Sequence, residues 1–291
     1  MSEGDRKVTL GPREVNFPSD YLQQLEDCNY AIDKPDLLRQ ILDQKGYLFI
    51  RGLHDREEVL NARRAVLQYV DTNATIRLLS ADTGHLDARC GGGCIPFMEV
   101  RDRENMSEDS GHITIEHIGI NSKQFTGAHV DNVYMGRGTQ NLYTMWTPFG
   151  DTTVEMGTLA VCEGSNQLPG FRRFQETYGE LDIEKEDMEG TGWFTEDPFE
   201  ITSKFGGQWK TSDFKAGDVL IFTMRTVHMS TTNITNFLRI SCDTRWQPAD
   251  EVADTRYVGD VGVTKPKYGL FGKETLAKKL TIADFKEKWK L

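Results

Sequence analysis

Residues 214–246 have the sequence FKAGDVLIFTMRTVHMSTTNITNFLRISCDTRW, in which two β-prone runs lie on either side of a histidine. Gly217 marks a turn that leads into the apolar strand 219–222. His228 follows that strand, and Arg239 opens the next one. An arginine that points into a barrel interior is costly to bury unless it meets an anion. We therefore expect Arg239 to bind an anionic ligand, to pair with a protein carboxylate, or to lie on the outer face.

Short β-prone runs of this kind occupy the chain from about residue 113 onward. Turn residues separate the runs, and their spacing favours a sandwich or barrel over alternating strands and helices. The runs are ITIEHIGI (113–120), AHVDNVYM (128–135), LYTMWTPF (142–149), GTLAVC (157–162), QWKTSDF (208–214), DVLIFTM (218–224) and LRISCDTRW (238–246).

Helical patterns flank this β-rich region. Residues 35–45 place their apolar side chains on one helical face, and Gly46 ends the helix before a buried strand at 47–53. Asp55, with Glu58 three residues later, has the form of a cap for a second helix that extends to about residue 69. Residues 71–112 are polar and Gly-rich, which is typical of a functional loop. We also expect a helix within FRRFQETYG (171–179) and a helical tail at about 272–291.

Charge and composition exclude several classes of protein. The formal net charge is −11 and the pI is about 5.1, and no basic stripe is present to neutralise phosphates, so we expect no nucleic-acid partner. No secretory signal and no transmembrane run is found, so we expect a cytoplasmic protein with no membrane partner. The five scattered cysteines indicate reduced thiols rather than a disulfide framework.

Six histidines are few enough to compare one by one. His129 and Asp131 form an H-x-D pair in a β-prone run, where alternate residues share one face of a strand. One further histidine would complete a set of two histidines and one carboxylate, which is typical of iron(II) oxygenases. The surroundings of His228 favour it for that place. The rival pair His85-x-Asp87 lies in a Gly-rich stretch, where a surface histidine is the better interpretation. The remaining histidines are expected to be structural, with His117 also a candidate for lining a pocket: His54, His112 and His117.

The order of these motifs resembles the phytanoyl-CoA dioxygenase family. The matching elements are His129 and Asp131, Trp146, GTLAVCEGS (157–165), GDVLIF (217–222), His228 and Arg239. The resemblance extends from about residue 113 to 247, with a weaker similarity in GYLFIRGL (46–53). SCDTRWQPA (241–249) and the FRRF segment make it most similar to the small-molecule hydroxylases of that family. The chain departs from the family at Asn166, where a histidine that is not an iron ligand is usual.

This resemblance implies a mainly β fold with flanking helices and a double-stranded β-helix (jelly-roll, cupin-like) core. One domain would span residues 1–291, with a helical N-terminal part at about 19–70, the jelly-roll core at about 113–247 and the helical tail at about 272–291. It further implies that iron(II) is bound by His129, Asp131 and His228.

The resemblance also implies a cosubstrate, 2-oxoglutarate, which reacts together with O₂. Arg239 would bind its distal carboxylate, Ser230 and Ser241 would assist, and Trp146 would pack against it. Related halogenases carry Gly or Ala in place of Asp131, so hydroxylation or another oxidation is favoured here. The substrate would be a small molecule of unidentified structure, and the oligomeric state is left open.

Two other functions are compatible with parts of the pattern. One is a binding module that keeps a metal or ligand without turnover. The other is a metal-dependent hydrolase or isomerase of the cupin type. The second alternative gives no reason for an arginine 11 residues after His228, and the first gives no reason for keeping every motif intact.

Overall fold

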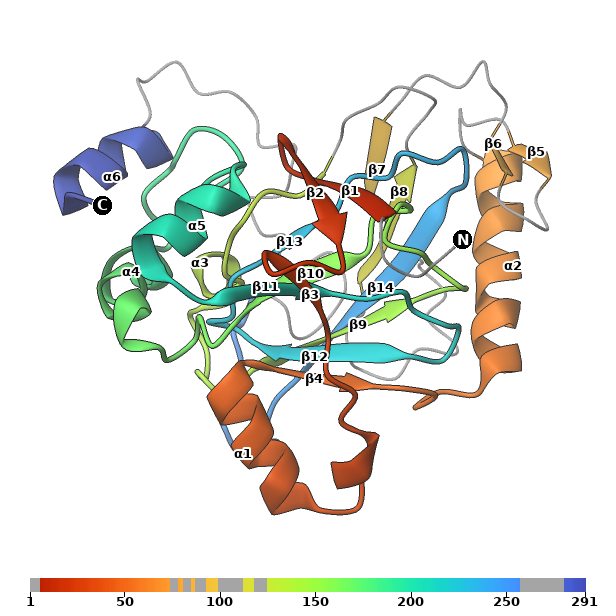
Figure 1. Cartoon of the computed structure of the whole chain (residues 1–291), viewed down its shortest axis with the longest axis horizontal. Helices are drawn as coiled ribbons and strands as arrows, with labels where there is room; N and C mark the ends of the chain where they lie inside the picture. The colour runs from red at the N-terminus through yellow and green to blue at the C-terminus, as the bar shows by residue number, and fades with distance from the viewer. Residues whose placement is uncertain are drawn as a thin grey trace.

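Two β-sheets form the centre of the molecule (Figure 1). The structure, a computed structural model, describes residues 6–73, 78–80, 85–86, 93–98, 112–117, 125–256 and 280–291. The strands of the two sheets are β3 (Leu22–Gln24), β4 (Tyr47–Ile50), β7 (Gly93–Met98), β8 (His112–His117), β9 (Tyr143–Pro148), β10 (Leu159–Glu163), β11 (Gln208–Thr211), β12 (Val219–Thr223), β13 (His228–Ser230) and β14 (Arg239–Trp246). One sheet has the order β4-β12-β9-β14-β8-β7, and the other has the order β13-β10-β11-β3. The fold is therefore mainly β, as the sequence predicts.

Helices lie around the sheets rather than between their strands. In Figure 1, the helices α4 (Arg172–Thr177), α5 (Pro198–Phe205) and α6 (Ile282–Trp289) gather at one end, and α2 (Arg56–Asn73) runs along the opposite side. The further elements are the paired strands β1 (Arg6–Leu10) and β2 (Arg13–Phe17), the paired strands β5 (Leu78–Ser80) and β6 (His85–Leu86), the helices α1 (Pro35–Lys45) and α3 (Asn132–Met135), and the 3₁₀ turns η1 (Asn29–Ala31), η2 (Pro169–Phe171) and η3 (Tyr178–Glu180).

The first two helices begin where the sequence predicts, and the first also ends there. Pro35 is the first residue of α1, and Gly46 ends it in the left-handed conformation, with a φ of 82° that glycine adopts without strain. The Asp55 carboxylate caps α2 by accepting a hydrogen bond from the Glu58 amide at 3.0 Å. The predicted helices over 35–45 and from 55 are confirmed, although α2 continues to Asn73.

Side chains alternate across the six-stranded sheet and give it two apolar faces. Trp146, Leu220 and Phe222 point from one face and form a buried cluster with Leu159 and Val161 of the four-stranded sheet. The opposite face is covered by α1. The cluster there consists of Cys28, Ala31, Ile41, Leu42, Leu48, Ile50, Met145 and Val219. One face of the six-stranded sheet therefore faces the four-stranded sheet, and side chains that point inward from either sheet lie in the space between them.

The segment 128–135 pairs with other segments of the chain only at its first two residues and ends as a helix. Ala128 and His129 form isolated bridges, and the chain then turns into α3 at Asn132. The predicted strand is therefore wrong in its second half. The helical tail is confirmed at α6, whereas residues 257–279 lie outside the described residues. Most of the predicted loop 71–112 also lies outside them.

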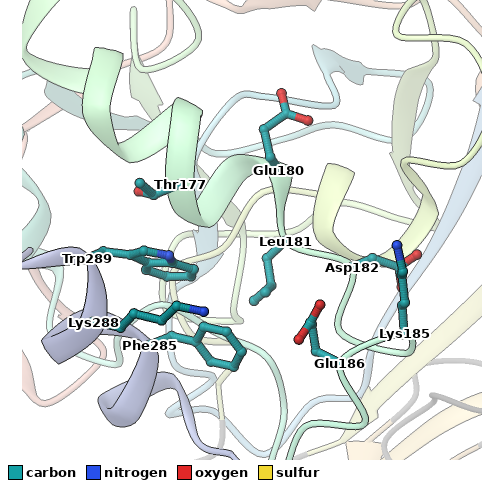
Figure 2. A pocket seen from close by; sticks show the side chains of 9 residues that line it. All are labelled: Thr177, Glu180, Leu181, Asp182, Lys185, Glu186, Phe285, Lys288 and Trp289. Atoms are coloured by element: carbon teal, nitrogen blue, oxygen red, sulfur yellow. The ribbon is translucent and has the colours of Figure 1, made fainter.

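The C-terminal helix α6 packs near residues 181–186, the segment that follows η3. Phe285 is buried there, and Lys286 forms an ion pair with Glu200 of α5 at 2.8 Å. Between α6 and this segment is a cavity of about 260 Å³ (Figure 2). Its lining residues are Thr177, Glu180, Leu181, Asp182, Lys185, Glu186, Phe285, Lys288 and Trp289. Within the described ranges, every helix is too short or too polar to span a lipid bilayer.

We predict that Phe174→Ala lowers the free energy of unfolding by about 3–5 kcal/mol, because truncating a buried ring removes packing and leaves a cavity. Phe174 is fully buried. Its ring contacts those of Phe171, Tyr178, Phe194 and Phe205. Denaturant titration followed by circular dichroism measures the change. Ile234→Ala is the control, since Ile234 is 58% exposed and its truncation should change the free energy by no more than about 0.5 kcal/mol. Equal losses in the two variants would contradict this view of the core.

Candidate metal centre and active site

Two histidines that are 99 positions apart in the sequence are direct neighbours in the structure. The amide of His129 donates a hydrogen bond to the carbonyl of His228 at 3.0 Å, and the amide of His228 donates one back at 3.0 Å. Residues paired in this way across antiparallel segments project their side chains to the same side. The two imidazole rings accordingly lie 4.2 Å apart between their centroids.

Each imidazole is oriented by a carbonyl two residues before it. Nδ1 of His129 lies 2.7 Å from the carbonyl oxygen of Gly127, and Nδ1 of His228 lies 3.0 Å from that of Thr226. A carbonyl oxygen only accepts hydrogen bonds, so each Nδ1 carries a proton, and Nε2 is the nitrogen that offers a lone pair to a metal. This arrangement of a ring nitrogen bound to a backbone carbonyl is typical of histidines that ligate metals.

The Asp131 carboxylate lies beside the two imidazoles, but the backbone conformation that places it there differs from the predicted one. Its backbone has helical angles, φ −64° and ψ −25°, and it is the residue that precedes α3. The predicted reason for its orientation, alternation along a strand, is therefore wrong. The turn into α3 instead brings its carboxylate beside both rings. Oδ1 lies 3.7 Å from Nε2 of His129 and 3.5 Å from Nε2 of His228.

These three side chains form a group that fits a metal ion. Their ligand atoms all lie within 4.8 Å of one another, and all three side chains are buried. Adjacent ligands of an octahedral ion with bonds of about 2.1 Å are separated by about 3 Å, so small side-chain rotations would close the set. Two imidazoles and one carboxylate on one side of an ion are the facial donor set that iron(II) takes in oxygenases.

The second carboxylate oxygen of Asp131 is bound by the protein. Oδ2 accepts a hydrogen bond from the Thr144 hydroxyl at 2.6 Å, and Nη2 of Arg245 lies 3.3 Å from it. Burial by itself would raise the pKa of this carboxyl group. The Arg245 guanidinium, both imidazoles and the Thr144 hydroxyl outweigh burial and lower the pKa of Asp131 to about 2. Asp131 is therefore an anion at neutral pH.

His129 is neutral at the same pH. Burial, followed by the neighbouring His228, lowers the pKa of His129 to about 3, and the attraction of Asp131 does not compensate. A neutral imidazole is the form that ligates a metal, so protons do not compete for Nε2 near pH 7. Aromatic rings support both imidazoles: Tyr134 lies edge-on to His129 and Phe222 packs on His228.

A second polar group lies along β14. Arg239 is only 3% exposed, and its Nη1 donates a hydrogen bond to the Ser241 hydroxyl at 2.6 Å. Its guanidinium carbon lies 5.9 Å from the centroid of the Trp146 ring, which belongs to the neighbouring strand β9. The structure thus brings together three of the residues predicted to bind the cosubstrate. The outer-face alternative for Arg239 is wrong, because its guanidinium lies beside Trp146, whose side chain packs with residues of the other sheet.

The fourth predicted residue, Ser230, lies in the other sheet. It follows His228 by two positions in β13, so the two side chains share a face, and its hydroxyl accepts a hydrogen bond from the Thr126 amide at 2.8 Å. Asn166, the departure from the family pattern, donates a hydrogen bond to the carbonyl of Asp43 and has a structural role. The side chains of His85 and Asp87 lie outside the described residues.

Sequence reasoning missed Thr144 and Arg245, the two residues that bind Asp131. Strand alternation contains the signal that identifies both. Thr144 precedes Trp146 by two residues in β9, and Arg245 follows Arg239 by six in β14. Each therefore lies on the same strand face as a residue that the sequence had already identified. The two are also directly opposite each other in the register of β9 and β14.

We predict that acid destabilises the metal-free protein partly through His129. Its pKa falls from 6.5 in the unfolded chain to about 3 in the folded protein, so the unfolded state binds the proton first as the pH falls. Between these values one such residue removes about 1.4 kcal/mol of stability per pH unit. His129→Asn keeps a donor for the Gly127 carbonyl but does not titrate.

Urea titrations in the presence of a chelator, at intervals from pH 7 to pH 4, measure this effect. We expect the free energy of unfolding of the variant to fall less steeply with decreasing pH than that of the wild type. Parallel curves for the two proteins would show that His129 is not held neutral by burial.

The chain is similar in sequence and in fold to known proteins. Residues 42–241 match the model of the phytanoyl-CoA dioxygenase (PhyH) family. Over 265 residues the chain is 24% identical to 1-deoxypentalenic acid 11-beta-hydroxylase of Streptomyces exfoliatus, a match that covers 79% of this chain and 87% of that enzyme. Among solved structures it is similar to the epimerase SnoN in complex with Fe³⁺, alpha ketoglutarate and nogalamycin RO (17% identity, 84% and 95% of the two chains, TM-score 0.49). It is also similar to EvdO2 from Micromonospora carbonacea var. aurantiaca complexed with 2-oxoglutarate (17% identity, 81% and 96% of the two chains, TM-score 0.47).

The family match includes both histidines of the centre, Asp131 and Arg239, and it extends over most of both sheets. The chain therefore belongs to the phytanoyl-CoA dioxygenase family of iron(II)- and 2-oxoglutarate-dependent oxygenases.

Proposed function

We propose that the chain is a dioxygenase that uses iron(II) and 2-oxoglutarate to hydroxylate an unactivated C–H bond of a small-molecule metabolite, with release of succinate and CO₂. The observation that carries this proposal is the convergence of His129, Asp131 and His228, with each Nδ1 bound to a carbonyl and each Nε2 left available. A facial set of three ligands leaves three positions of an octahedral ion for a bidentate cosubstrate and O₂.

In this proposal the three side chains bind iron through Nε2 of His129, Nε2 of His228 and one oxygen of Asp131. Bound iron supplies the activation of O₂, which no side chain can supply by itself. The protein fixes the ligands and excludes water. The buried rings of Phe222 and Trp146 contribute to that exclusion, because both belong to the apolar layer between the sheets.

Arg239 is proposed to bind the distal carboxylate of 2-oxoglutarate. A buried guanidinium is stabilised by an anion, and its planar fork matches a carboxylate with two hydrogen bonds. The hydrogen bond to Ser241 and the position beside Trp146 limit the orientations of the guanidinium. We assign Ser241 and Ser230 as further contacts of the cosubstrate and Trp146 as an apolar wall for its methylene groups.

We further propose that the two sheets form a double-stranded β-helix within one domain that spans residues 1–291. Successive strands from β9 to β14 alternate between the sheets, except where β10 is followed by β11 in the same sheet. The bridge between His129 and His228 adds a segment to the edge of the four-stranded sheet, between β8 and β9 in chain order. Such a core, at about 113–247, places the metal ligands at one end of the space between the sheets.

Hydroxylation is preferred to other outcomes because Asp131 is present and completes the donor set. The similarity to a hydroxylase of a deoxypentalenic acid supports a small-molecule substrate. We place the reaction in the cytoplasm, in accord with the acidic composition and the buried thiols of Cys28 and Cys162.

We predict that purified protein, supplied with iron(II), ascorbate and 2-oxoglutarate, releases succinate slowly and releases it faster with the true substrate. Asp131→Ala and His228→Ala should reduce succinate release to the level of a metal-free sample, because each removes a ligand. His54→Ala is the control and should retain activity, since the hydrogen bond of His54 to the Gly217 carbonyl is made by its backbone amide and does not need the side chain. Chromatographic quantification of succinate measures all four proteins.

Full turnover in Asp131→Ala and His228→Ala would show that the centre is not where the reaction occurs. A screen of host metabolites, followed by the mass of each product, then identifies the substrate. Absence of succinate release by the wild type with every candidate would favour a metal- or ligand-binding protein without turnover.

Arg239 gives a separate prediction. Arg239→Ala should raise the KM for 2-oxoglutarate on the order of 10- to 100-fold, since a charge-assisted hydrogen bond contributes about 1.5–3 kcal/mol. Arg239→Lys keeps the charge without the fork and should give a smaller increase. Metal affinity should be nearly the same in both variants. An unchanged KM in Arg239→Ala would place the distal carboxylate elsewhere.

A further inference from the structure

The two oxygens of Asp131 have different surroundings. Oδ1 faces Nε2 of both histidines, at 3.7 Å and 3.5 Å. Oδ2 faces the protein, where the Thr144 hydroxyl donates a hydrogen bond at 2.6 Å and Nη2 of Arg245 lies at 3.3 Å. The carboxylate is thus divided into an oxygen available to a metal and an oxygen bound by the strands behind it.

Arg245 is itself fixed on two sides. Its Nε lies 3.3 Å from Sδ of Met135, at the end of α3, and its Nη2 contacts Asp131, which precedes α3. Its backbone is paired with Thr144 in the register of β14 and β9. The side chain is 18% exposed, so water screens its charge only weakly. Arg245 therefore connects β14 with both ends of the short helix that begins at the ligand.

The number of coordination positions that remain free on the metal depends on whether Asp131 binds it through one oxygen or through two. A carboxylate that binds through both oxygens would occupy two positions and, with two imidazoles, would leave two of six. Bidentate 2-oxoglutarate would fill those two and leave none for O₂. A carboxylate that binds through one oxygen leaves the three positions that the reaction needs.

We propose that Arg245 is a positioning residue that keeps Asp131 a single-oxygen ligand. By pairing with Oδ2, its charge holds that oxygen away from the metal and directs Oδ1 toward it. This role rests on the proposed function, since it concerns the same metal centre. Thr144 acts in the same direction through the hydrogen bond that its hydroxyl donates to Oδ2, but it brings no full positive charge, and its effect on Asp131 is smaller than that of Arg245.

The test uses manganese(II) as a probe of the centre, without turnover. Broadening of its electron paramagnetic resonance by ¹⁷O-labelled water reports the number of metal-bound waters. We expect three waters in the wild type and two in Arg245→Met, which has similar length and no charge. Binding of 2-oxoglutarate to the manganese-loaded protein is measured by calorimetry, and we expect its affinity to fall at least 10-fold in Arg245→Met.

Three other variants separate positioning from general stability. Arg245→Lys restores the charge and should recover part of the lost affinity, and Thr144→Val should show a smaller loss than Arg245→Met. Arg137→Met is the matched control. Arg137 also follows α3, but its guanidinium pairs with Asp182, at a distance of 2.6 Å, and not with a metal ligand. We expect its water count and its affinity for 2-oxoglutarate to match those of the wild type.

Wild-type water count and affinity in Arg245→Met would overturn the proposal, and so would a failure of Arg245→Lys to improve on Arg245→Met. A decrease in melting temperature alone, with both readouts unchanged, would likewise reduce Arg245 to a structural role. Failure of the wild type to bind manganese(II) and 2-oxoglutarate would instead contradict the proposed function, so the two failures are distinguishable.

Discussion

The paired backbone hydrogen bonds between His129 and His228 are the constraint on which the centre depends. They join two segments that are far apart in the sequence and set both side chains on one side of the sheet. Because the backbone fixes the separation, each imidazole needs only one more hydrogen bond to a carbonyl to fix its orientation. The sheet therefore fixes the positions of both imidazoles, and the turn into α3 places the Asp131 carboxylate beside them.

Neighbouring charges and burial set the charge states of the ligands, which the backbone alone does not determine. A buried anion beside two buried imidazoles is unfavourable unless other groups stabilise it. Thr144 and Arg245 stabilise Asp131 from the side opposite to the histidines, and burial keeps His129 neutral. The centre thus combines the anionic Asp131 with a neutral His129 near pH 7, which suits a divalent cation. The same strand, β14, contributes both Arg245 and Arg239, so one element supports the ligand and the proposed cosubstrate site.

Much of the fold and the centre was predictable from the sequence, for identifiable reasons. Local signals such as Gly46 and the Asp55 cap placed the first helices, and motif order selected all three members of the triad. The strand assigned to 128–135 was wrong in its second half because a period of two cannot be distinguished from one helical turn over so few residues. Alternation from Arg239 places Arg245 on the same face of β14, but its contact with Asp131 depends on the turn into α3 and on the register between β9 and β14, which no local pattern contains.

The most direct test of the account is a crystal structure of the protein grown without oxygen in the presence of iron(II) and 2-oxoglutarate. The account predicts one iron ion bound by Nε2 of His129, Nε2 of His228 and Oδ1 of Asp131, with the distal carboxylate of the cosubstrate on Arg239. An iron ion bound elsewhere, or bound without Asp131, would contradict it.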